Sequence, residues 1–181
     1  FIGRYNWMTI NLRTTKYSDG ADINSNDTIN PQIKNDSLGL LYSLAAVANH
    51  VTTVPNSKLC PTGWRLPEFD TWYNLIDATN TDQYSAAPHL KDTSIMWSVF
   101  PDIVMTDSTG FSALPAGRYQ YSNGVGAHSE AGERANFWSE GEGGTEYYSN
   151  YWYLDYSTNS FEYSYDPHFL YQDPLYLSVR C

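Results

Sequence analysis

The chain has 181 residues, a formal net charge of −10 and 41% hydrophobic residues. This length and hydrophobic content predict one folded domain, residues 1–181, with a core of its own, and they exclude intrinsic disorder. No apolar run approaches the roughly 20 residues that cross a bilayer, and the sequence lacks the basic stripe that nucleic-acid binding requires. We therefore expect neither a nucleic-acid partner nor membrane insertion of this domain.

The first 66 residues are expected to contain a strand, a loop and a helix. Residues 5–12 (YNWMTINL) are bulky and partly alternating, which predicts a strand, and residues 19–31 are rich in Asp, Asn, Ser and Gly, which predicts a loop. Residues 38–50 have a helical composition. The apolar face of this helix would hold Leu41, Leu44, Ala45 and Ala48.

A second helix is predicted from Pro67, which suits the first turn of a helix, with Glu68 favourably placed for the helix dipole. Apolar residues then recur at helical spacing. They are Phe69, Trp72, Tyr73, Leu75 and Ile76.

After about Thr79, short apolar pieces alternate with Gly, Ser, Pro and Asp, which predicts short strands joined by long loops. The pieces are Met96–Phe100, Phe111–Leu114 and Phe137–Trp138, with clearer strands at Tyr151–Tyr156 and Tyr176–Val179. The order of elements predicts an α+β fold, with two helices, short antiparallel strands and termini that lie close together.

Short motifs are spread over nearly the whole chain, and CP-x-GW with the terminal VRC is the most specific of them. They are Trp7-Met8, Asn11-Leu12, Leu41-Tyr42, Ala45-Ala46, Cys60-Pro61, Gly63-Trp64, Leu66-Pro67, Trp72, Leu75, Leu90-Lys91, Gly110–Gly117, Phe137–Ser139 and Leu177–Cys181. This pattern resembles the Fibrobacter succinogenes major paralogous domain of Bacteroidetes surface proteins.

The resemblance implies a C-type-lectin-like fold, no catalytic activity and an extracellular or cell-surface location, attached to the outer membrane or a pilus. Because Phe1 is neither a Met nor the start of a signal segment, we expect the domain to be the C-terminal part of a longer exported protein, such as a pilus tip or lipoprotein. Three features depart from the pattern: Tyr176-Leu177 stands where Gly-Phe usually precedes SVRC, residues 140–145 are acidic and Gly-rich, and residues 19–31 have no counterpart.

The chain also resembles the variable proteins of diversity-generating retroelements, in which codons are rewritten at template adenines. Rewriting of Asn codons yields Tyr, Ser, Asp, His, Phe, Leu and Asn, and residues 147–176 are dense in these types and hold nine of the 16 tyrosines. The hypothesis is a hypervariable recognition surface for a protein or glycan on another cell, host or phage. Its candidate residues are Tyr151, Tyr153, Asp155, Ser157, Asn159, Tyr163, Tyr165, His168, Phe169 and Tyr171, with Leu154 and Tyr156 facing the core.

Cys60 and Cys181 leave two alternatives open, one disulfide in an oxidising compartment or two buried free thiols. The resemblance favours the disulfide, because the two cysteines look like the family's fold-closing pair.

No cofactor is expected, although a structural calcium in an acidic loop stays open. Asp22, Asn24 and Asn26 have the 1, 3, 5 spacing of an EF-hand, but Asp27 and Ile33 replace its Gly and Glu. The EPN or QPD and WND triplets of calcium-dependent sugar lectins are missing from the sequence. A calcium-dependent lectin therefore remains only an alternative.

A polysaccharide hydrolase is a weaker alternative, because no motif selects two of the 20 acids as a catalytic pair. Five tryptophans are expected in the core, with sugar stacking as the alternative. They are Trp7, Trp64, Trp72, Trp97 and Trp138.

Overall fold

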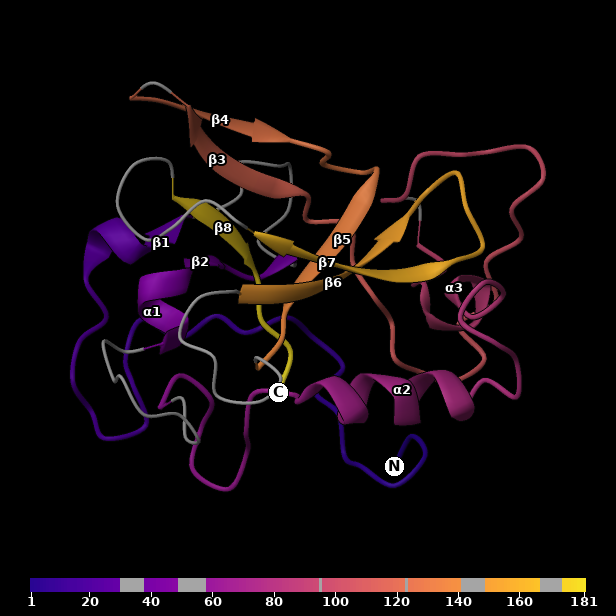
Figure 1. Ribbon diagram of the computed structural model, residues 1–181, viewed down its shortest axis with the longest axis horizontal. Helices are drawn as coiled ribbons and strands as arrows, with labels where there is room; N and C mark the ends of the chain where they lie inside the picture. Colours follow the sequence, from indigo (N-terminus) through magenta and orange to yellow (C-terminus); the bar gives the residue numbers. More distant parts are fainter. Residues whose placement is uncertain (30–37, 49–57, 95, 123, 141–148, 167–173) are drawn as a thin grey trace.

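The computed structural model describes residues 1–29, 38–48, 58–94, 96–122, 124–140, 149–166 and 174–181. It confirms a mixed α+β architecture, in which short helices flank one twisted sheet (Figure 1). The helical elements are η1 (Ser25–Asp27), α1 (Leu44–Ala48), α2 (Phe69–Asp77) and α3 (Ala87–Leu90). The strands are β1 (Thr28–Ile29), β2 (Leu41–Ser43), β3 (Arg118–Ser122), β4 (Val125–Ser129), β5 (Arg134–Trp138), β6 (Ser149–Asp155), β7 (Phe161–Asp166) and β8 (Leu175–Ser178). None of the helices in these ranges is long and apolar enough to cross a membrane.

Strand β8 organises the sheet, whose main path runs β1-β2-β8-β5-β6-β7. It pairs antiparallel with β2 and with β3, and it meets β5 in parallel at Phe137 and Ser178. All four of its residues are buried. A strand that is covered on both faces reads as a continuous apolar run rather than an alternating one, and this explains the terminal LYLSV sequence.

The two larger of three apolar clusters lie against the sheet. One packs α2 and Trp7 against the buried side of β5, β6 and β7, where Trp152, Leu154 and Phe161 are fully buried. The other joins α1 and the segment around Cys60 to Trp138 and the end of β8. The sheet is therefore packed on both sides.

The sequence pattern of α2 accounts for its formation and for its end. Pro67 and the N-cap Glu68 precede it, so Pro67 lies just outside the helix rather than in its first turn. Its apolar spacing buries Trp72, Leu75 and Ile76, as predicted. The helix ends at Asp77, and three residues later Asn80, a residue that tolerates the left-handed region, takes a φ of 58°.

Arg180 is fully buried and donates five hydrogen bonds. Its Nε and Nη2 hold Oδ1 of Asn11 at 3.2 and 2.7 Å. Nη1 reaches the carbonyls of Met8 and Phe111 at 2.9 and 2.5 Å, and Nη2 reaches that of Ser112 at 3.2 Å. The guanidinium thus ties the end of β8 to two distant segments of the chain.

The charge of Arg180 is held by dipoles and rings rather than by a direct ion pair among the described residues. Its guanidinium carbon lies 4.7 Å from the ring centroid of Phe111 and 5.6 Å from that of Phe137. Burial lowers the pKa of Arg180, which the charges of Asp107 and Asp92 oppose. Because a buried charge is tolerated only when its donors are satisfied, the five hydrogen bonds to these four oxygens are needed as a set.

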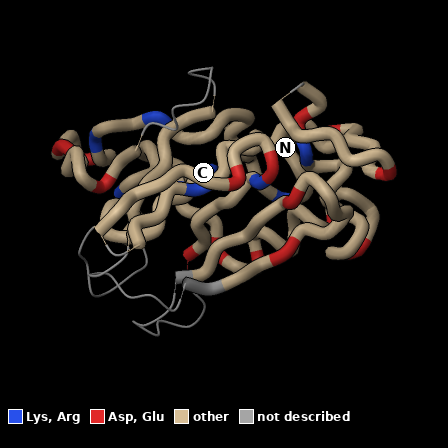
Figure 2. Tube along the Cα trace, turned by 90° about the horizontal axis from the view of Figure 1, so that it is seen from above, with Lys and Arg blue, Asp and Glu red and all other residues tan. Residues whose placement is uncertain are grey.

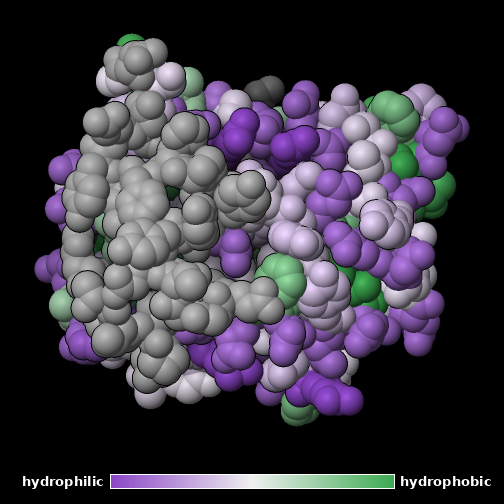
Figure 3. Space-filling model, in the orientation of Figure 1, coloured by the Kyte–Doolittle hydropathy of each residue, from purple (hydrophilic) through white to green (hydrophobic). Residues whose placement is uncertain are grey.

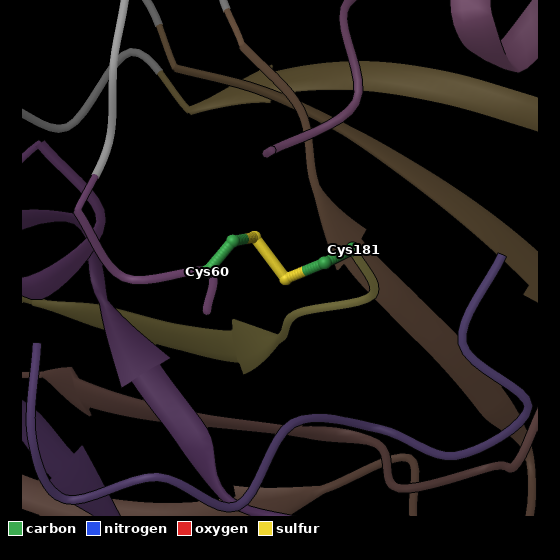
Figure 4. The surroundings of a disulfide bond; sticks show 2 residues. All are labelled: Cys60 and Cys181. Carbon is green, nitrogen blue, oxygen red and sulfur yellow. A yellow bond between two sulfur atoms is a disulfide. The ribbon is translucent and has the colours of Figure 1, made fainter. Parts of the chain in front are cut away.

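The two ends of the chain lie together, as predicted (Figure 1). The amide of Met8 donates to the carbonyl of Cys181, and that of Leu12 donates to the carbonyl of Val179. Cys60 and Cys181 form a disulfide across 121 residues (Figure 4). The prediction of a disulfide is confirmed, and such a long closed loop strongly restricts the unfolded chain.

Lys91 is a second buried cation, directly after α3. Its Nζ donates to the carbonyls of Asp155 and Thr158 at 2.6 and 2.9 Å and lies 5.3 Å from the ring centroid of Trp97. Burial lowers the pKa of Lys91 to about 8, against the opposing effect of Asp155. Lys91 thereby joins α3 to the turn between β6 and β7.

Several expectations for the N-terminal half were wrong. Residues 5–12 form no strand, because only Met8 and Leu12 bond to the chain end while Arg180 takes the Met8 carbonyl. The helix expected over residues 38–50 begins only at Leu44, because β8 recruits Leu41–Ser43 as a strand. Its C-terminal end, residues 49 and 50, lies outside the described residues. Trp64 is 39% exposed rather than buried.

In the second half, residues 96–100 form no strand, and Phe111–Leu114 contributes only an isolated bridge from Ala113 to Lys91. The hairpin of β3 and β4 was not expected. The loop predicted over residues 19–31 contains η1 and β1 in its described part, and residues 30 and 31 lie outside it.

We expect Arg180→Lys to destabilise the fold by about 3 kcal/mol, because a compact ammonium with three donors cannot reach all four acceptor oxygens that the guanidinium bonds, and an unpaired buried acceptor costs about 1–3 kcal/mol. Chemical denaturation under non-reducing conditions measures this loss. Arg13→Lys is the control, because Arg13 is exposed. A denaturation midpoint of Arg180→Lys equal to that of the control would contradict the stabilising role of the Arg180 guanidinium.

We expect the stability of the wild type, relative to Lys91→Met, to rise with pH between about 8 and 10.5. The pKa of Lys91 in the folded state is below its ordinary value of 10.5, so the unfolded chain binds more protons in this window and alkalinisation favours the folded state. The relative gain between pH 7 and pH 9.5 should be about 1–2 kcal/mol by urea denaturation. Parallel pH curves for the two proteins would contradict the lowered pKa.

Candidate functional site

The tyrosine-rich segment folds in its described part into a hairpin of β6 and β7, residues 149–166, which we call the tyrosine hairpin. Register pairs Tyr151 with Ser164, Trp152 with Tyr163 and Leu154 with Phe161. β7 ends the strand order of the sheet. Because successive side chains of a strand point to opposite faces, the hairpin presents two different surfaces.

One surface holds Tyr151 and Tyr153, both half-buried, with ring centroids 6.2 Å apart. Tyr151 meets the buried Trp138 at 6.3 Å, edge to face. The Tyr153 hydroxyl donates to Glu162 Oε2 at 2.5 Å. Burial, followed by the hydrogen bond and charge of Glu162, raises the pKa of Tyr153 to about 12, so this phenol stays neutral and able to donate.

A charged network borders this surface and fixes its geometry. The Arg134 guanidinium lies 4.8 Å from the Tyr153 ring centroid, and its Nε donates to Asp155 Oδ2 at 2.6 Å. Asp155 Oδ1 also accepts from the amide and hydroxyl of Ser157. Burial opposes ionisation of Asp155, but the bonds from Ser157 and Arg134 outweigh it and lower its pKa. Asp155 and Ser157 therefore serve the turn of the hairpin.

The opposite surface carries Tyr163, which is 48% exposed. Its ring meets Phe69 of α2 at 4.9 Å, edge to face, and Trp152 at 5.4 Å. The Tyr163 ring thus lies between the aromatic core and solvent and contacts both. Because α2 covers this side, Tyr163 and Tyr153 do not share one contact surface.

The ten predicted ligand-binding residues are therefore divided. Tyr151 and Tyr153 lie together, Tyr163 lies across the sheet, and Asp155 and Ser157 are engaged in the turn. Asn159 is exposed beside that turn, and its carbonyl accepts from Ala87. Leu154 is buried as predicted, and Tyr156 packs against the core while remaining half-buried. The Tyr165 side chain and residues His168, Phe169 and Tyr171 lie outside the described residues. The binding role of all ten stays a prediction.

A second aromatic cluster went unnoticed in the sequence. Tyr119, Tyr121 and Tyr176 lie within 5.4 to 6.3 Å of one another, ring centroid to ring centroid, and Tyr119 meets His128 at 4.7 Å. Tyr121 and Tyr176 line a hollow of about 320 Å³. The missed signal was the alternating sequence of residues 118–122 before Asn123-Gly124, a dipeptide that favours tight hairpins.

The surface is acidic and mostly polar, as the composition of the sequence indicates. Lys and Arg are scattered among more numerous Asp and Glu (Figure 2). The described part of the face in Figure 3 is mostly hydrophilic, with separate hydrophobic side chains.

The EF-hand-like residues have local partners. Asp22 pairs with Lys16 at 2.5 Å, and Asn24 Oδ1 accepts from the amide of Asn26 at the start of η1. Among the described residues, no group of three or more His, Cys, Asp and Glu could hold a metal ion.

Comparisons with known proteins give one family. The Fibrobacter succinogenes major domain matches residues 1–181, while no curated protein and no solved structure matches the chain. Several of the short motifs that resemble this family lie in the packing around Arg180, the disulfide and Trp138. The chain belongs to the Fibrobacter succinogenes major domain family.

Proposed function

We propose that the chain is a ligand-binding and adhesion domain of C-type-lectin-like fold in an exported surface protein. The tyrosine hairpin would contact a protein or glycan on another cell, host or phage. No catalytic step is assigned to it. The domain would act at the outer membrane or at a pilus tip.

One observation carries this proposal: motif residues around Arg180 are buried, whereas the tyrosines of the hairpin are partly exposed. Asn11, Phe111 and Arg180 belong to the family motifs and are all fully buried. Tyr153 and Tyr163 of the hairpin lie outside those motifs, and they are partly exposed and 48% exposed, respectively. Neither belongs to the apolar cluster around the end of β8, so substitution of either leaves that packing intact.

Rigidity supports the same proposal. The Arg134 network fixes Tyr153, and Phe69 fixes Tyr163, so these rings lose little freedom when a partner binds. Tyr also combines a large contact area with a polar hydroxyl. The finer proposal is that codons of residues 147–176 are rewritten by a diversity-generating retroelement.

Adhesion can be measured with the domain on fluorescent beads, applied to bacterial cells of the native community and to phage particles. We expect Tyr153→Ser and Tyr163→Ser each to lower retention by about fivefold or more, because interface tyrosines commonly contribute more than 1 kcal/mol. Tyr84→Ser is the matched control, since Tyr84 is 70% exposed and is not part of the hairpin.

Equal retention of the hairpin variants and the control, with unchanged denaturation midpoints, would refute the proposed contact surface. Retention that is abolished by EDTA would instead favour the calcium-dependent lectin.

Genome sequence tests the diversification. We expect a nearby reverse transcriptase gene and an imperfect repeat of the codons for residues 147–181, differing from them at template adenines. Differences confined to other template bases would contradict it.

A further inference from the structure

The CP-x-GW motif forms a tight turn that holds an aromatic ring in solvent. The amide of Trp64 donates to the carbonyl of Pro61 at 2.9 Å, and Gly63 between them has a φ of +87°, as the third position of a type II turn requires. Cys60 anchors one end through its disulfide to Cys181, and the buried Leu66 anchors the other. The exposed Trp64 is therefore carried by a rigid support.

Core packing does not explain this tryptophan. Its side chain is 39% exposed, and no aromatic ring among the described residues stacks on it. Trp7 and Trp72 are both packed into the aromatic core. An exposed indole on a fixed turn is a surface that a flat, partly apolar ligand can cover at low entropic cost.

Trp64 borders a hollow of about 460 Å³, a volume in the usual range of ligand sites. The eleven described residues that line it include Tyr5, Asn6, Arg4 and Arg65, and no Asp or Glu. The whole chain, by contrast, has 20 acidic and 10 basic residues. The hollow is thus chemically unlike the rest of an acidic protein.

The two arginines differ in how freely they can bind an anion. Arg65 forms a surface pair with Glu68 at 3.1 Å and lies 5.7 Å from the ring centroid of Tyr5. Arg4 makes no ion pair within the described part of the chain, while its amide is fixed to Asn74 Oδ1 at 2.9 Å. The Arg4 guanidinium is therefore available on an anchored backbone.

We propose that this hollow binds a carboxylated sugar, such as a uronate residue of an acidic polysaccharide. Trp64 stacks on the sugar ring, Arg4 takes the carboxylate with its planar pair of donors, and Asn6 bonds a hydroxyl. The geometry needs no metal. Since Thr71 of α2 lines the hollow while Phe69 and Tyr73 contact the aromatic side of the hairpin, this site is separate from the tyrosine hairpin and independent of its proposed function.

Calorimetry and ¹⁵N–¹H spectra with trigalacturonate test the site. We expect a dissociation constant of about 0.1–1 mM and a shift of one exposed indole resonance. The fully methyl-esterified trisaccharide, which lacks the charge, should bind at least about tenfold more weakly. Trp64→Ala and Arg4→Gln should each weaken trigalacturonate binding at least about tenfold.

Arg13→Gln is the matched control, because it removes an exposed charge elsewhere, and it should change the affinity less than about twofold. Trp64→Phe, which keeps a ring, should retain intermediate affinity. Tyr163→Ser should leave uronate binding unchanged, which separates this proposal from that for the hairpin. Absence of binding at millimolar trigalacturonate, equal binding of the ester, or equal affinities of the Arg4→Gln and Arg13→Gln proteins would overturn the site.

Discussion

The burial of Arg180 is the constraint on which the rest of the structure depends. A fully buried guanidinium without a carboxylate in contact must find neutral acceptors for its donors, and these come from Asn11, the Met8 carbonyl and the Phe111–Ser112 segment. Asn11 in turn donates to the Leu38 carbonyl and to Ser178 Oγ. Segments from the start, middle and end of the chain are thus fixed at one point beside the disulfide.

This constraint gives the family motifs a physical meaning. In the terminal LSVRC, Leu177 and Val179 fill the apolar cluster, Arg180 binds two distant segments and Cys181 closes the disulfide. Other motif residues serve the same junction, since the Trp138 indole donates to the Tyr42 carbonyl at 2.7 Å. Trp64 is the exception, because it is held in solvent beside an arginine-lined hollow. The hairpin tyrosines lie outside these motifs, on the surface of the scaffold.

The sequence predicted what local pattern determines. The α2 helix follows from its apolar spacing, and β6 and β8 follow from short aromatic and apolar runs. The disulfide followed from the resemblance. The errors arose where distant partners decide the backbone: Leu41–Ser43 becomes a strand because β8 lies beside it. Residues 5–12 form no strand, because the Met8 carbonyl accepts a hydrogen bond from Arg180.

The candidate site was predictable as a region but not in its parts. Composition identified the tyrosine-rich segment, yet only the register of β6 against β7 separates Tyr163 from Tyr151 and Tyr153. Asp155 looked like a recognition residue, and only the structure reveals its bonds to Arg134 and Ser157. The exposure of Trp64 depends on a glycine turn and on the adjacent disulfide, whose two cysteines are 121 residues apart.

A scaffold that tolerates a changing surface is the central claim, and surface display of two randomised libraries tests it most directly. One library varies Tyr151, Tyr153 and Tyr163, and the other varies Asn11, Phe111 and Arg180. Protease-resistant display, read by deep sequencing, should persist for most members of the first library and for very few of the second. Similar survival in both libraries would contradict the separation of scaffold from binding surface.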